Sequence, residues 1–169
     1  MYTYGRSLTA TVYVVNNGRV LLHMHKKYHT WFPLGGHVEP DELPHEAALR
    51  EVMEESGLSV KLVVREPQNF SIGLVTRIPS PVAVYAEGDK ETEEFLDFIY
   101  AAVSESKEPV CSDEESHIFR WFSVEELRDE KEDIKIHIRN TAIYCLGYAQ
   151  DKIDAENAPL YVSGDKFRL

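Results

Sequence analysis

One stretch of 23 residues constrains this chain more than any other, namely residues 36–58, GHVEPDELPHEAALREVMEESGL. It is bounded by Gly36 and Gly57, and glycine permits the turns at which regular elements begin and end. Pro44 is well placed for the first turn of a helix, and no further helix breaker follows it before Gly57. The stretch therefore predicts a loop followed by a helix that ends at Gly57.

The charged and apolar residues of this helix lie on different sides. At about 100° per residue, Glu51, Glu54 and Glu55 fall within one arc roughly 100° wide. The opposite side is expected to be apolar and to bury Leu49, Val52 and Met53, with Ala48 at its edge. Ala47 lies on the acidic side one turn earlier, where its small side chain leaves room for ligands.

Three carboxylates at these spacings repel one another by a few tenths of a kcal/mol per pair. A divalent cation between them removes this cost, so the acidic side predicts a metal site as an alternative to an ordinary solvated helix face. Hard oxygen ligands suit Mg²⁺, with Mn²⁺ as the alternative, better than they suit zinc.

The same residues match the Nudix box, Gly-x5-Glu-x7-Arg-Glu-U-x-Glu-Glu-x-Gly-U, where U is a bulky aliphatic residue. The matching positions are Gly36, Glu42, Arg50, Glu51, Val52, Glu54, Glu55, Gly57 and Leu58. The chain thus resembles Nudix hydrolases. The resemblance implies an α+β fold, a Nudix-type α/β/α sandwich around a mixed β-sheet, and Mg²⁺-dependent hydrolysis of a phosphoanhydride bond by attack of water at phosphorus.

The resemblance also implies a role for each matching residue. The metal ligands it implies are the backbone carbonyl of Gly35 and the carboxylates of Glu51, Glu54, Glu55 and Glu115. Our hypothesis is that Glu51 and Glu55 are chiefly ligands and that Glu54 bridges to a metal or to the attacking water. The general base stays open among Glu51, Glu54 and Glu115.

Further residues of the box are expected to support the site rather than to react. These supporting residues are Gly36, Glu42, Arg50 and Gly57, with Glu42 and Arg50 paired to hold the loop against the helix. Two positions depart from the usual pattern, because Asp41 replaces a frequent glycine and Leu43 replaces a frequent serine or threonine. Leu43 has no oxygen to cap the helix, so either Glu42 or a water molecule is expected to do so.

A second, weaker resemblance lies in residues 112–123, SDEESHIFRWFS. The family has an additional glutamate about six residues ahead of a Trp-Phe pair, and Glu115 is the best match, with Glu114 as the alternative. An acidic surface loop is the competing interpretation of this segment. His117 fits a structural role equally well.

The composition limits the classes of binding partner and the cellular compartment that we expect for this chain. The net charge of −11 argues against an extended nucleic-acid-binding face and against docking on anionic lipid, but is compatible with a small phosphorylated ligand bound through metals. Cys111 and Cys145 do not form a zinc motif or a disulfide framework, which favours reduced thiols in the cytoplasm. No leader peptide and no run of about 18 apolar residues is present in the sequence, so we expect no membrane segment.

Hydrophobic alternation predicts strands on both sides of the helix. The predicted strands are residues 9–15, 19–25, 58–64, 82–86, 95–103 and 118–122, with a hairpin turn at Asn17 and Gly18 and an acidic loop at 87–94. A capping box at residues 123–126 opens a short helix, and a final amphipathic helix includes residues 134–149. We expect one domain over residues 1–157 and a tail, or an arm to a partner, over 158–169.

The substrate is less constrained than the reaction. Tyr28 and Trp31 are candidates to stack on a base, and Lys27 and Arg77 to meet phosphates, although core packing and solvated surface are the alternatives. We expect a small nucleotide-like substrate and a monomer or homodimer. Two other functions compete: a catalytically silent binding or regulatory domain, and an isoprenoid diphosphate isomerase, which needs a reactive cysteine such as Cys111.

Overall fold

The structure is a computed structural model that describes residues 6–64, 71–72, 75–89, 93–110, 118–153 and 160–161. Its helices are α1 (Pro44–Ser56), α2 (Val124–Arg128) and α3 (Ile136–Ile153). Its strands are β1 (Ser7–Asn16), β2 (Arg19–His25), β3 (Thr30–Phe32), β4 (Leu34–His37), β5 (Val60–Val63), β6 (Ser71–Ile72), β7 (Val75–Thr76), β8 (Ala83–Asp89), β9 (Glu93–Ser104), β10 (Phe119–Phe122) and β11 (Leu160–Tyr161).

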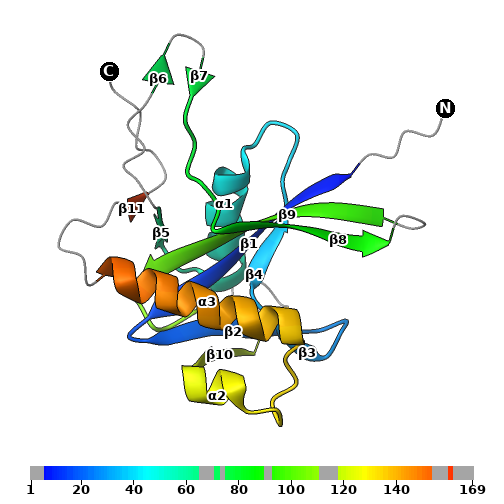
Figure 1. The fold of residues 1–169 in the computed structure, drawn as a ribbon, viewed down its shortest axis with the longest axis vertical. Coiled ribbons are helices and arrows are strands. Elements are labelled where there is room, and N and C mark those ends of the chain that lie inside the picture. Colours follow the sequence, from blue (N-terminus) through cyan, green and yellow to red (C-terminus); the bar gives the residue numbers. More distant parts are fainter. Residues whose placement is uncertain are drawn as a thin grey trace.

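Alternation along β1 creates the two cores of the molecule, since successive side chains of a strand point to opposite faces. Ala10, Val12 and Val14 are buried with the apolar side of α1. Tyr13 and Val15 point the other way and are buried with α3. The sheet thus lies between α1 on one face and α3 on the other, as Figure 1 shows. This is the expected α/β/α arrangement.

The sheet is mixed, and β1 is its centre. β1 pairs antiparallel with β2 and β4 and parallel with β9, and β9 pairs antiparallel with β5 and β8. β3 and β10 extend the sheet from β2, and β11 extends it from β5. β6 and β7 form a separate two-stranded ladder. The mixed sheet of the predicted α+β fold is therefore present.

α1 buries Val52 and Ala48 as expected, but the rest of its buried side differs from the prediction. Ala47, Ala48 and Val52 are completely buried, whereas 47% of Met53 is exposed. Our assignment of Met53 to the buried stripe was wrong. Ala47 was expected to leave room for ligands on the acidic side, but it is buried in the core between α1 and the sheet.

The start of α1 is capped by a residue that we did not predict for this role. Leu43 lacks a capping side chain, and the Glu46 carboxylate accepts a hydrogen bond from the Leu43 N–H at 2.9 Å. Glu42 pairs with Arg50 and accepts from the Glu39 N–H instead. The helix ends at Gly57, whose φ of 64° is the left-handed conformation that glycine adopts readily.

The strand predictions were correct in place but incomplete. Strands lie at each predicted position, and the turn at Asn17 and Gly18 joins β1 to β2. β3 and β4 were missed, because Trp31 to His37 were interpreted as a loop around two glycines. The acidic loop that we predicted at 87–94 is shorter in the structure, because β8 continues to Asp89 and β9 begins at Glu93. Leu160–Tyr161 of the expected tail pairs with β5.

In the part of the chain that the structure describes, none of the helices has both the length and the apolar character needed to cross a bilayer.

β4 can pair with β1 only because residue 35 is glycine. Gly35 has a φ of 149°, and a Cβ at this position would lie 2.3 Å from the Ala10 carbonyl oxygen and 2.9 Å from the Thr11 Cα. Both neighbours are backbone of the central strand, so they cannot move aside without disrupting the sheet.

Replacing Gly35 with alanine is therefore expected to lower the free energy of unfolding by about 3 kcal/mol or more. Gly147→Ala is the matched control, because nothing lies within 4 Å of a Cβ there. This control lies within α3 and is expected to gain up to about 1 kcal/mol from helix propensity. Urea unfolding measures both variants, and equal stability of Gly35→Ala and the wild type would contradict the packing described above.

Candidate active site

Arg50 holds the acidic face of α1 together. Its Nε and Nη2 donate to the two carboxylate oxygens of Glu42, each at 2.9 Å. Its Nη1 donates to Glu51 at 2.8 Å and to Glu54 at 3.0 Å, and Nη2 also reaches the His37 carbonyl at 3.0 Å. The ion pair expected between Glu42 and Arg50 is therefore present. Hydrogen bonding to Arg50 lowers the pKa of Glu42 and, in return, raises that of Arg50.

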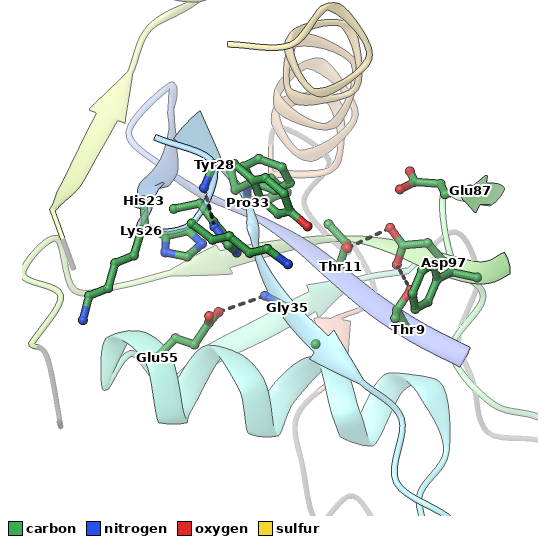
Figure 2. Close-up of a pocket in the computed structure, with 15 residues that line it drawn as sticks. Thr9, Thr11, His23, Lys26, Tyr28, Pro33, Gly35, Glu55, Glu87 and Asp97 are labelled. Atoms are coloured by element: carbon green, nitrogen blue, oxygen red, sulfur yellow. Dashed lines mark hydrogen bonds between the residues drawn. The ribbon is translucent and has the colours of Figure 1, made fainter. Parts of the chain in front are cut away.

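Glu55 points away from this network and toward β4. Its Oε2 accepts a hydrogen bond from the Gly35 N–H at 2.9 Å, as Figure 2 shows. Burial is the main cause that raises the pKa of Glu55 to about 7, with the charges of Glu51 and Glu54 acting in the same direction and the hydrogen bond from the Gly35 N–H opposing them. Glu55 is thus a carboxylate that is costly to ionise unless a cation lies beside it.

The Glu51 carboxylate occupies space that is open because Gly36 has no side chain. A Cβ at residue 36 would lie 2.4 Å from Glu51 Oε1, so only glycine accommodates this carboxylate against β4. The Glu51 side chain is 16% exposed, whereas that of Glu54 is 59% exposed. Glu51 and Glu55 therefore form the inner part of the acidic face, and Glu54 lies at its outer edge.

These residues fit a hard divalent cation. The donors are carboxylates on one helix face, two of them are largely enclosed between α1 and the glycines of β4, and one has a raised pKa. No three acidic, histidine or cysteine side chains of the described residues converge closely enough to hold a metal as they lie. Arg50 instead contacts Glu51 and Glu54, so metal binding requires these carboxylates to exchange partners.

A cavity of about 620 Å³ lies beside the acidic face. Its lining residues come from β1, β2, β3, β4, α1, β8, β9 and the segments that join β2 to β3 and β3 to β4, and Figure 2 draws them as sticks. They are Thr9, Thr11, His23, His25, Lys26, Lys27, Tyr28, Phe32, Pro33, Gly35, Gly36, Glu55, Glu87, Phe95 and Asp97. Glu55 of α1 lines this cavity together with Gly35 and Gly36 of β4. A ligand in the cavity can therefore approach the acidic face.

One wall of the cavity is aromatic. The rings of Tyr28 and Phe32 are stacked at 24° with centroids 5.7 Å apart, and His25 lies 4.6 Å from Tyr28. The Nζ atoms of Lys27 and Lys135 lie 5.4 and 5.2 Å from the centroid of the Tyr28 ring. Tyr28 is 52% exposed, so its ring offers a surface for stacking with cations around it.

Of the four residues that we predicted as substrate contacts, two line the cavity in the structure and two do not. Tyr28 and Lys27 line the cavity. Trp31 does not, because it is 8% exposed in the core and packs edge-to-face against Phe122 with centroids 5.0 Å apart. Arg77 is exposed in the segment between β7 and β8, and it is not among the described residues that line the cavity. The burial of Trp31 corrects its proposed stacking contact, whereas the phosphate contact of Arg77 stays a prediction.

Several predicted residues cannot be placed. Glu115, its alternative Glu114, His117 and Cys111 lie outside the described residues. The other cysteine, Cys145, is on the buried side of α3, and burial raises its pKa to about 12. Cys145 is therefore unsuited to act as a thiolate.

The sequence analysis missed a polar group within the cavity. Asp97 is 6% exposed and accepts hydrogen bonds from the hydroxyls of Thr9 and Thr11 at 3.0 and 2.8 Å. The sequence contains a feature that could have identified this residue, because Asp97 interrupts the otherwise apolar strand FLDFIYAAV. An acidic residue within a buried strand needs partners, and the partners here come from the neighbouring strand β1.

Comparisons with known proteins agree with this geometry. The family profile of the NUDIX domain matches residues 5–141. The nucleoside triphosphatase NudI of Escherichia coli strain K12 is 35% identical over 97 residues, which span 57% of this chain and 64% of the relative. The aligned part thus spans less than two thirds of the length of the curated relatives that it matches.

Solved structures show the same fold. A NUDIX-family hydrolase from Clostridium perfringens is 32% identical and superposes with a TM-score of 0.74, covering 86% of this chain and 99% of that one. A MutT NUDIX hydrolase from Burkholderia pseudomallei is 20% identical with a TM-score of 0.58, which supports the fold alone.

The raised pKa of Glu55 predicts a pH-dependent effect of its replacement. Because the pKa is higher in the folded state, the folded state binds more protons between about pH 4.5 and 7, and stability falls as the pH rises through this range. In metal-free buffer, Glu55→Gln removes this cost and is expected to raise the melting temperature by a few degrees at pH 8, with little gain at pH 5.

Glu105→Gln serves as the control, because the Glu105 side chain is 91% exposed. It is expected to change the melting temperature equally at both pH values. Adding Mg²⁺ at pH 8 should stabilise the wild type more than Glu55→Gln, since a ligand stabilises the state that binds it. An identical effect of Glu55→Gln at pH 5 and pH 8 would show that this carboxylate ionises without cost.

Proposed function

The chain belongs to the Nudix family, and on this premise we propose that it is a Mg²⁺-dependent hydrolase of a phosphoanhydride bond in a nucleotide or a nucleoside diphosphate derivative. The observation that supports this most strongly is the enclosure of Glu51 and Glu55 against the glycines of β4 at the edge of a cavity. Carboxylates enclosed in this way beside a ligand-sized cavity suit a metal that meets the substrate.

In this proposal, Glu51 and Glu55 are the principal metal ligands, and Glu54, Glu115 and the Gly35 carbonyl complete the set. When bound, Mg²⁺ neutralises the diphosphate and lowers the pKa of the attacking water. The enclosure by β4 orients the two inner carboxylates before the metal arrives. Arg50 balances the acidic charge on the outer side, where its Nη1 contacts Glu51 and Glu54.

The reaction forms a bond from a water oxygen to phosphorus and breaks the bond from that phosphorus to the bridging oxygen. The proton of the water passes to a carboxylate within hydrogen-bond reach, and the bridging oxygen leaves with its electron pair on the second phosphate. Glu51, Glu54 and Glu115 are the candidates for this base. Glu54 is the most exposed of the described candidates and therefore the most accessible to water.

The cavity supports a nucleotide-like substrate. Its volume of about 620 Å³ is within the range of small-molecule sites. The stacked rings of Tyr28 and Phe32 suit a planar base, and Lys26 and Lys27 provide positive charge in the same wall. A relative named as a nucleoside triphosphatase points to the same class of substrate.

Activity can be tested with a panel of nucleoside triphosphates, nucleotide sugars, ADP-ribose and dinucleoside polyphosphates in Mg²⁺ and ¹⁸O-labelled water. Mass spectrometry is expected to find one ¹⁸O atom in a phosphate group of the products, because water attacks phosphorus. Glu51→Gln and Glu55→Gln are each expected to lower kcat at least about a hundredfold. Glu105→Gln, at an exposed position on a surface loop, is expected to retain wild-type kcat.

Two results would contradict the proposal. A folded protein that binds Mg²⁺ and substrate analogues but turns nothing over would be a binding domain. Turnover that persists in both Glu51→Gln and Glu55→Gln would place the reaction outside the acidic face of α1.

A further inference from the structure

Asp97 is a buried carboxylate in the cavity, on the side away from the metal-binding face. It lies on β9, whereas the Gly35 N–H that holds Glu55 belongs to β4, and β1 separates the two strands. Adjacent strands are about 4.8 Å apart, so β4 and β9 lie about 10 Å apart. A nucleotide bridges a distance of this order between its phosphate and the edge of its base. Figure 2 shows Asp97 and Glu55 on different sides of the cavity.

Asp97 retains the capacity to accept further hydrogen bonds. Thr9 donates to Oδ1 and Thr11 donates to Oδ2, so each carboxylate oxygen has one described donor. A carboxylate oxygen has two acceptor positions, which leaves one on each oxygen. The two threonines also fix the carboxylate, since Thr9 is the register partner of Asp97 and Thr11 lies two residues further along β1. A ligand therefore meets two fixed acceptors side by side.

The surroundings of Asp97 select against a second anion. Burial raises the pKa of Asp97, the hydroxyls of Thr11 and Thr9 oppose this, and the charge of Glu87 raises it further. Glu87 also lines the cavity and adds negative charge near Asp97. Ligand groups that donate hydrogen bonds are stabilised here, and carbonyl oxygens and phosphates are repelled.

Aromatic rings near Asp97 determine the shape of the ligand. Phe95 is on the same face of β9, two residues before Asp97, and lines the cavity with Phe32 and Tyr28. A flat group can stack on these rings while its edge faces the carboxylate. The combination of aromatic surface and paired acceptors suits a nucleobase with N–H groups on its edge.

We infer that Asp97 determines base specificity, and that it accepts two hydrogen bonds from adjacent N–H donors of a guanine-type base. This inference rests on the proposed function. A carboxylate can only accept, so both groups that face it must donate. Guanine offers a ring N–H beside an exocyclic amino group. Adenine and cytosine place a ring acceptor beside the amino group, and uracil flanks its N–H with two carbonyls.

The inference can be tested on the wild-type protein by changing the substrate one donor at a time. kcat/KM with Mg²⁺ is measured for GTP, ITP, ATP, CTP and UTP. ITP differs from GTP by the exocyclic amino group alone, and its kcat/KM is expected to be at least about tenfold lower, because one of the two acceptor positions that Asp97 offers to the ligand then has no donor. Equal kcat/KM for GTP and ITP would overturn the inference, whatever the variants do.

Asp97→Asn tests the residue itself. Asparagine keeps the size of the side chain but offers one acceptor and one donor, which complements the edges of adenine and cytosine. We expect kcat/KM for GTP to fall by about tenfold or more, and the ratio of kcat/KM for ATP to that for GTP to rise by at least the same factor. Asp151→Asn, at an exposed position of α3, is the control and is expected to leave this ratio unchanged.

The outcomes separate the inference from the proposed function. If the wild type hydrolyses none of the five triphosphates and no other substrate of the panel, the proposed function fails. If it hydrolyses them and Asp97→Asn lowers all five equally, the proposed function stands and the inference fails. Should Asp97→Asn not fold, as judged by circular dichroism, the comparison of GTP with ITP decides alone.

Discussion

The contacts of Arg50 are the interaction on which the candidate site depends most. One guanidinium contacts Glu42 in a bidentate pair, Glu51 and Glu54 through Nη1, and the carbonyl of His37. Single exposed ion pairs contribute about 1 kcal/mol or less, but a planar fork that joins several groups also fixes their geometry. Without Arg50, the loop before α1 would lose its anchor and the carboxylates would repel one another. The same contacts keep Glu51 beside β4.

β4 connects this acidic face to the cavity. Gly35 and Gly36 allow the strand to approach both β1 and α1 more closely than any side chain would permit. The backbone N–H of Gly35 donates to Glu55, and Gly35, Gly36 and Glu55 all line the cavity. Two adjacent residues without side chains thus adjoin both the metal-binding carboxylates and the cavity. In our account, the metal-binding face and the substrate-binding cavity adjoin at β4.

Local patterns predicted the acidic helix, its end at Gly57 and the ion pair of Glu42 with Arg50, because each depends on residues close in sequence. Contacts between distant segments were not predictable in this way. Met53 was assigned to the core although periodicity leaves the rotation of a helix uncertain, and Trp31 was a candidate for stacking until its packing on Phe122 was known. The position of Asp97 depends on a hydrogen bond from Thr9, which lies 88 residues away in sequence, so a local pattern could not predict it.

The central claim is that the acidic face of α1 binds a divalent cation that meets a nucleotide in the adjoining cavity. A crystal structure with Mn²⁺ and a non-hydrolysable GTP analogue tests this most directly, because anomalous scattering locates Mn²⁺ without ambiguity. Our account predicts a Mn²⁺ peak about 2.0–2.4 Å from carboxylate oxygens of Glu51 and Glu55, with the diphosphate beside it and the base against Asp97. Mn²⁺ bound elsewhere, with the nucleotide outside the cavity, would contradict it.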